Sequence, residues 1–146
     1  MKKFLPVIIL AILFYGFNYV KDHGFTIPEN PSTSQGADAI LLHAFQNRQS
    51  DIQVQGQGTV VKVLRDDLDG SRHQKFLLRL ASGQTVLVSH NIDLAPRVSG
   101  LAAGDTVDFY GEYEWNDKGG VIHWTHHDPA GRHVGGWLKH NGNTFQ

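Results

Sequence analysis

The stretch that decides the fold reads TVDFYGEYEW at residues 106–115, NDKGG at 116–120 and VIHWTHH at 121–127. Val107, Phe109, Gly111 and Tyr113 alternate with more polar residues, which is the period of a strand with one buried face. The Asn, Asp and Gly residues that follow predict a hairpin turn. Residues 121–127 then form the partner strand, which ends before Pro129 because proline donates no ladder hydrogen bond.

Three more strands are predicted upstream, at residues 52–64, 73–80 and 84–90, with turns at 65–72 and 82–83. Gly56 and Gly58 indicate a bend or bulge in the first of these strands. Residues 91–104 have no regular pattern and form a connector. This order predicts a mainly β protein with a small five-stranded Greek-key barrel of the OB type, and an SH3-like barrel is the alternative.

One short amphipathic helix is expected before the barrel, at residues 37–48. Its apolar residues recur at the spacing of one helical face, namely Ala37, Ile40, Leu41, Ala44 and Phe45. We therefore expect this helix to pack on the barrel.

The N-terminal segment, residues 1–20, is predicted to be a signal anchor that forms a transmembrane helix. Its 17 residues from Phe4 to Val20 carry no charge, and a helix of that length spans roughly 26 Å. Lys2 and Lys3 precede this run, so the remainder of the chain is expected on the outer side of the membrane. A cleaved signal peptide is the alternative. The predicted location is the bacterial inner membrane, single-pass, with residues 21–36 as a linker and 37–146 as a periplasmic barrel domain with a C-terminal tail.

Composition narrows the function classes. The formal net charge is −1, so nucleic acid is only a weakly supported partner. The chain has no cysteine, which excludes thiolate metal sites, thiol nucleophiles and disulfides.

Histidines are the remaining candidates for a metal-binding or ligand-binding site, because five of the nine fall within residues 121–141. Imidazole is a common ligand for divalent transition metals such as zinc. The candidate metal ligands are His126, His127, Asp128 and His133. No HExxH or comparable metal motif is present, and strand alternation would place His123 and His127 on one face and His126 on the other.

A second set of residues is predicted to bind a ligand at the rim of the barrel. Histidines at strand ends, arginines able to hold anions and a tryptophan able to stack on bases or sugars make up this set. Its members are Arg72, His73, His90, Arg132 and Trp137.

Four segments resemble an uncharacterised bacterial family of small exported proteins, classed as a domain of unknown function. They are RHQKF at residues 72–76, HNIDLAPR at 90–97, GEYEWNDKGGVIHWTHHDP at 111–129 and GGWLKHNG at 135–142. The resemblance covers roughly Gln55 to Gln146. It implies a location in the cell envelope and an OB-like barrel, and it implies no activity.

Two functions follow as hypotheses from these patterns. The first is a membrane-tethered periplasmic OB-like module that binds an anionic or sugar oligomer through His, Arg and Trp side chains. The second is a metal-dependent hydrolase, of phosphodiesterase or nuclease type, with a His/Asp site. No nucleophile and base can be assigned from the sequence, so the binding module is preferred.

Overall fold

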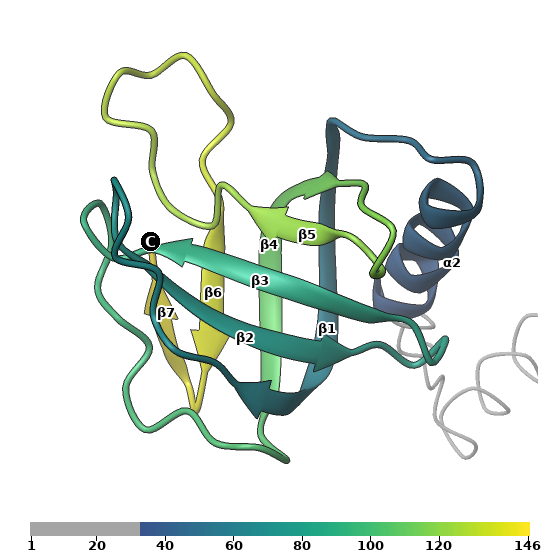
Figure 1. Cartoon of the computed structure of the whole chain (residues 1–146), viewed down its shortest axis with the longest axis horizontal. Coiled ribbons are helices and arrows are strands. Elements are labelled where there is room, and N and C mark those ends of the chain that lie inside the picture. The colour runs from purple at the N-terminus through teal and green to yellow at the C-terminus, as the bar shows by residue number, and fades with distance from the viewer. Residues whose placement is uncertain (1–32) are drawn as a thin grey trace, which may run out of the picture. The chain divides into compact units, whose positions relative to one another are not determined.

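The computed structural model describes residues 33–146, which form one helix and seven strands (Figure 1). The elements are α2 (Thr33–Gln46), β1 (Ile52–Val63), β2 (His73–Arg79), β3 (Thr85–Asn91), β4 (Thr106–Glu114), β5 (Val121–His123), β6 (Trp137–His140) and β7 (Asn143–Phe145). The predicted transmembrane helix lies outside the described residues. Within residues 33–146, no helix is both long and apolar enough to cross a membrane.

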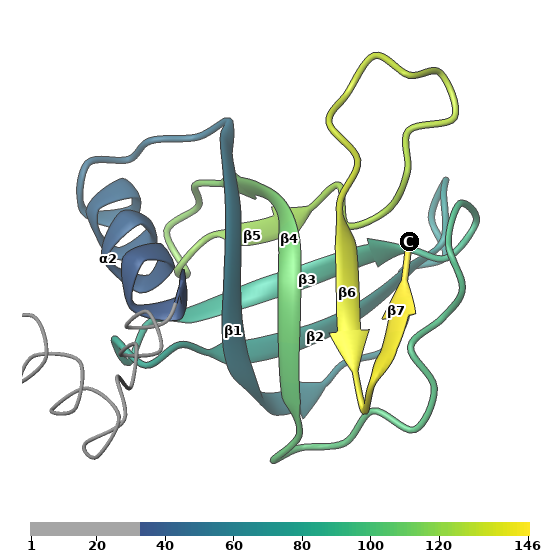
Figure 2. The ribbon, with the colours of Figure 1, turned by 180° about the vertical axis from the view of Figure 1, so that it is seen from behind.

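Five of the strands close into a barrel, as the sequence predicted. The order is β1-β2-β3-β5-β4, and β4 pairs back onto β1. β3 and β5 run parallel, whereas the other neighbours in the barrel run antiparallel. β6 adds to the first half of β4, and β7 pairs with β6, so the tail forms a small hairpin beside the barrel (Figure 2).

The period-two pattern of the deciding stretch produces the two faces of β4. Val107, Phe109 and Tyr113 are fully buried, while Glu112 and Glu114 on alternate positions stay partly exposed. Gly56 of β1 allows this packing, because a Cβ there would lie 2.7 Å from the ring of Phe109. The glycines of β1 therefore serve close packing, and the predicted irregularity lies after them, between Val60 and Lys62.

Helix α2 lies against one end of the barrel (Figure 1). It begins at Thr33, four residues before the predicted start, and ends at Gln46. Leu41 and Ala44 are fully buried in the shared core. The Trp115 Nε1–H donates to the Phe45 carbonyl at 3.1 Å, so the end of the helix is tied to the segment that follows β4.

The connector after β3 lies over another part of the core. Val98 is 1% exposed, and its backbone N–H and carbonyl both bond the buried side-chain amide of Gln74, at 2.9 and 3.0 Å. The Gln74 side chain thus makes the two hydrogen bonds that a neighbouring strand would otherwise make to Val98, so the buried N–H and carbonyl of Val98 are both satisfied. These bonds fix the connector against the core although it forms no strand.

Strand β5 is shorter than predicted, since it ends at His123 rather than at His127. Trp124 has φ 53°, a left-handed conformation that is uncommon for a bulky residue and incompatible with a continuing strand. The chain then leaves the sheet in a long loop that projects from the barrel before β6 (Figures 1 and 2). The predicted alternation of histidines beyond His123 was therefore wrong.

Candidate functional site

A pocket of about 320 Å³ lies on the outer face of the barrel, over β2, β3 and the end of β5. Three imidazoles, one indole and small polar side chains line it. The lining residues are His73, Ser89, Asn91, Leu94, His123, Trp124 and His126. Two larger open pockets, of about 530 and 610 Å³, lie elsewhere on the barrel, and neither contains an aromatic platform or more than one histidine.

Strand register explains why residues distant in sequence meet in this pocket. His73 is directly opposite Asn91 in the β2–β3 pair. Val88 is opposite Ile122 in the parallel β3–β5 pair, so Ser89 and His123 follow side by side on the outer face. The short β5 and the turn at Trp124 then bring His126 to the same pocket.

Two of the three pocket histidines are fixed by backbone carbonyls. The Nδ1 of His73 lies 2.7 Å from the Ser71 carbonyl, and the Nδ1 of His126 lies 2.6 Å from the His127 carbonyl. A carbonyl only accepts, so each Nδ1 carries the proton. In the neutral ring, each Nε2 therefore keeps a lone pair, which has no hydrogen-bond partner among residues 33–146 and can accept a hydrogen bond from a ligand.

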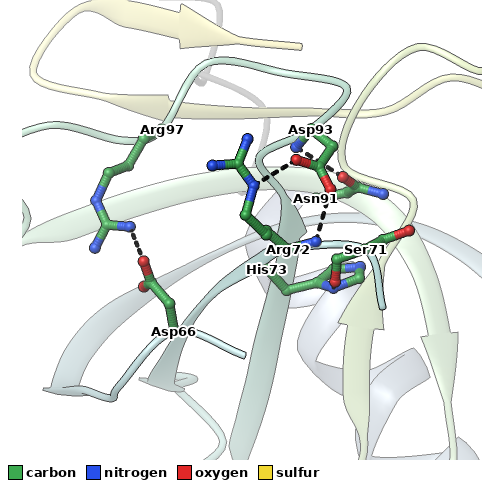
Figure 3. A network of polar contacts seen from close by, with 7 residues as sticks. All are labelled: Asp66, Ser71, Arg72, His73, Asn91, Asp93 and Arg97. Carbon is green, nitrogen blue, oxygen red and sulfur yellow. Dashed lines mark hydrogen bonds and ion pairs between the residues drawn. The ribbon is translucent and has the colours of Figure 1, made fainter. Parts of the chain in front are cut away.

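A polar network holds the β1–β2 loop next to His73 (Figure 3). Asp93 accepts from the Arg72 backbone N–H at 2.8 Å and from its Nε at 2.6 Å, and these two bonds hold the pKa of Asp93 below its usual value. Arg97 forms an ion pair with Asp66 in the same network. The predicted ligand-binding residue Arg72 is thus engaged by Asp93, although its side chain remains 58% exposed.

The loop after β5 is organised by Asp128. Its carboxylate accepts the backbone N–H groups of Ala130, Arg132 and His133, at 2.9, 2.7 and 2.9 Å. These bonds lower the pKa of Asp128. Two other residues of the predicted sets, His127 and Arg132, are exposed in this loop.

His133 connects this loop to the barrel. Its Nε2 lies 2.6 Å from Glu112 and its Nδ1 lies 2.7 Å from the Val134 carbonyl. Both partners are acceptors, so the ring is a cation when both bonds form. Burial lowers the pKa of His133, but the bonds to Glu112 and Val134 outweigh it and raise the value.

Glu112 and Glu114 form a second cluster with His123, beside the pocket. One ligand atom from each lies within 4.8 Å of the others. Among the described residues, this is the group of three or more potential metal ligands whose atoms lie close enough together to hold one ion. The predicted metal ligands His126, His127, Asp128 and His133 are not part of it. Sequence reasoning missed both glutamates, although the predicted hairpin places β4 opposite His123.

The remaining predicted residues lie apart from the pocket lining. His90 is 0% exposed, with Nε2 at 3.0 Å from the Pro96 carbonyl and Nδ1 at 2.8 Å from the Thr125 hydroxyl. Burial lowers its pKa to about 4, so His90 is a neutral core residue. Trp137 packs beside Tyr110 on β4, with their ring centroids 6.1 Å apart.

Comparison with models of known protein families identifies the family of this chain. A family model described as a protein of unknown function (DUF3465) matches residues 26–146. A search of the curated proteins found no significant match.

Proposed function

The chain belongs to the DUF3465 family, whose function is unknown, and from the site we propose that it is an OB-type module that binds a sugar oligomer. The pocket over β2, β3 and β5 carries this proposal. It combines two imidazoles with free Nε2 lone pairs, those of His73 and His126, with the indole of Trp124.

The strand order supports the OB type. A five-stranded barrel with β1-β2-β3-β5-β4 order, parallel β3 and β5, and a β4–β1 closure suits a Greek-key connection. OB barrels bind oligonucleotides and oligosaccharides on the face of their second and third strands and on the neighbouring loops. The pocket lies on that face.

Charge favours a hydroxyl-rich ligand over an anionic one. Arg72 and Arg97 are paired with Asp93 and Asp66, and Glu112 and Glu114 stand next to the pocket histidine His123. Imidazole Nε2 atoms that accept hydrogen bonds match the hydroxyl donors of a sugar, whose apolar face suits an indole. An anionic oligomer would instead meet the Glu114 carboxylate, beside a Glu112 that is already paired with His133.

The proposal includes the location expected from the sequence: a single-pass anchor in the bacterial inner membrane, with the barrel in the periplasm. The uncharged run from Phe4 to Val20 supports it. Membrane fractionation and the N-terminal sequence of the mature protein test it. A mature N-terminus at Lys21 or beyond would contradict an uncleaved anchor.

The experiment for the binding function is a capture assay with the full chain against three immobilised probe sets: neutral oligosaccharides, anionic oligosaccharides and single-stranded DNA. We expect capture by a class of neutral oligosaccharides, reduced in Trp124→Leu. Capture by DNA or by anionic oligosaccharides alone would overturn the sugar proposal in favour of an anion-binding module. Capture by none of the three would overturn both.

The metal-dependent hydrolase stays an alternative prediction. One observation supports this alternative, the cluster of Glu112, Glu114 and His123. Carboxylate and imidazole ligands of this kind occur in hydrolytic metal sites. Metal-stimulated release of shorter products from the captured oligosaccharide would favour this alternative over a binding module.

A further inference from the structure

Strands β4 and β5 bring two carboxylates and an imidazole together on the outer face of the barrel. Glu112 of β4 is directly opposite His123 of β5, and Glu114 is opposite Val121. Glu112 and Glu114 are two residues apart and therefore lie on the same face of β4. The His123 Nε2 lies 3.3 Å from the Glu112 Oε1 and 3.8 Å from the Glu114 Oε1. Adjacent ligand atoms of a tetrahedral zinc site, each about 2 Å from the ion, are separated by about 3.3 Å.

The imidazole of this cluster lacks a hydrogen bond. Its Nε2 atom is buried and has no hydrogen-bond partner within the described structure, although two carboxylates surround it. A buried polar atom without a partner is unfavourable, because it has lost its hydrogen bonds to water and gained none in return. A cation held between the nitrogen and the two carboxylate oxygens would satisfy all three groups.

Glu112 is already oriented for such a role. Its Oε2 bonds the His133 Nε2 at 2.6 Å, which leaves its Oε1 facing His123. His133 is in turn stacked on Trp124, with ring centroids 4.0 Å apart and planes 8° apart. Hydrogen-bonded partners of this kind fix the ligands of metal sites.

From this geometry we propose that Glu112, Glu114 and His123 bind one divalent transition cation such as zinc. Two carboxylates and one imidazole suit zinc or manganese better than calcium or magnesium, which prefer oxygen ligands alone. Water would complete the coordination from the side of Glu114, whose side chain is 32% exposed.

The cation site goes beyond the proposed sugar binding and does not depend on it. His123 contributes to both, with the cation on the β4 side of its ring and the pocket on the β3 side. The competing arrangement is an ion pair between protonated His123 and the two glutamates. That arrangement predicts no stoichiometric metal.

The test is titration of the purified, metal-free full chain with Zn²⁺ alone by isothermal calorimetry, and with Co²⁺ followed by its visible absorption. We expect one ion per chain and a tetrahedral cobalt spectrum. Glu114→Gln and His123→Phe each remove a direct ligand, and we expect each to weaken binding by more than about 100-fold, because loss of an outer partner alone costs about 10–100-fold.

Two matched controls separate this site from the rest of the surface. Asp108→Asn changes another outward-facing acid on β4, and His73→Phe changes a pocket histidine outside the cluster. Both should bind Zn²⁺ as tightly as the unaltered chain, whereas His73→Phe should lose sugar capture. No stoichiometric ion, or equal loss in the cluster variants and the controls, would overturn the proposal.

Discussion

His133 stacks on Trp124 with ring centroids 4.0 Å apart and planes only 8° apart, and the same imidazole bonds Glu112 at 2.6 Å. One side chain of the projecting loop thus contacts both Trp124, directly after β5, and Glu112 on β4. We regard this bridge as the element that places the loop against the pocket.

Removing the bridge should loosen the loop without unfolding the barrel. We expect His133→Ala to reduce the free energy of unfolding by about 1 kcal/mol, because it removes a partly solvated, charge-assisted hydrogen bond. Amide hydrogen exchange of residues 125–135 should rise. His127→Ala, an exposed histidine of the same loop, is the control. Unchanged exchange in His133→Ala would show that the loop is held by other contacts.

Stability should fall on acidification because of His90. Its folded pKa, lowered to about 4 by burial, lies below the unfolded value near 6.5. Between these values the unfolded chain binds more protons, so stability is lost as the pH falls from 6.5 toward 4. The contribution is about 3 kcal/mol, since one pKa unit corresponds to about 1.4 kcal/mol.

Urea unfolding between pH 7 and pH 4 measures this loss. The variant His90→Gln keeps a donor and an acceptor but does not titrate, so its stability should fall less steeply over the same range. An equal slope in both proteins would mean that other groups cause the acid sensitivity.

The attachment of α2 should depend on Leu41, which is 0% exposed. We expect Leu41→Ala to lower the free energy of unfolding by about 2–5 kcal/mol, from lost burial and the cavity it leaves. Ile40→Ala is the matched control, because Ile40 is 49% exposed and should change stability much less. Similar losses in the two variants would contradict the packing of α2.

Trp124 should contribute directly to sugar binding. Stacking of a nucleic-acid base on an aromatic side chain is worth about 1–3 kcal/mol. Taking the same range for the apolar face of a sugar ring, we expect Trp124→Leu to weaken binding of the captured oligosaccharide by about 5- to 150-fold. Trp137→Leu, outside the pocket lining, should leave the affinity unchanged. A greater loss of affinity in Trp137→Leu than in Trp124→Leu would indicate that the ligand binds near β6 instead.

The sequence predicted the barrel strands well because their signal is local. Alternation at Val107, Phe109 and Tyr113 needs only one strand and one buried face. The end of β5 could not be predicted in the same way. Trp124 has a positive φ, and Gly136, twelve residues later, lies so close that a Cβ on it would be 2.2 Å from the Trp124 carbonyl.

His73 was predicted as a ligand-binding residue and His126 as a metal ligand. Both line one pocket, where they meet through β3 and the loop after β5, and no local pattern reveals this. His90 alternates in step with Val86 and Val88, whose side chains face inward. This local pattern indicates that His90 lies in the core. Glu112 and Glu114 resemble solvated surface acids until the register of the hairpin sets them beside His123.

The central claim is that the free Nε2 atoms of His73 and His126 hold a sugar oligomer. Its most direct test is the affinity of the full chain for the captured oligosaccharide in the double variant His73→Phe/His126→Phe, which keeps an aromatic ring at both positions but removes the imidazole nitrogens. The control is His43→Phe/His127→Phe, the same change at two exposed histidines. We predict at least a tenfold loss in the pocket variant, about 1.4 kcal/mol, and none in the control. Equal affinities in both variants would contradict the claim.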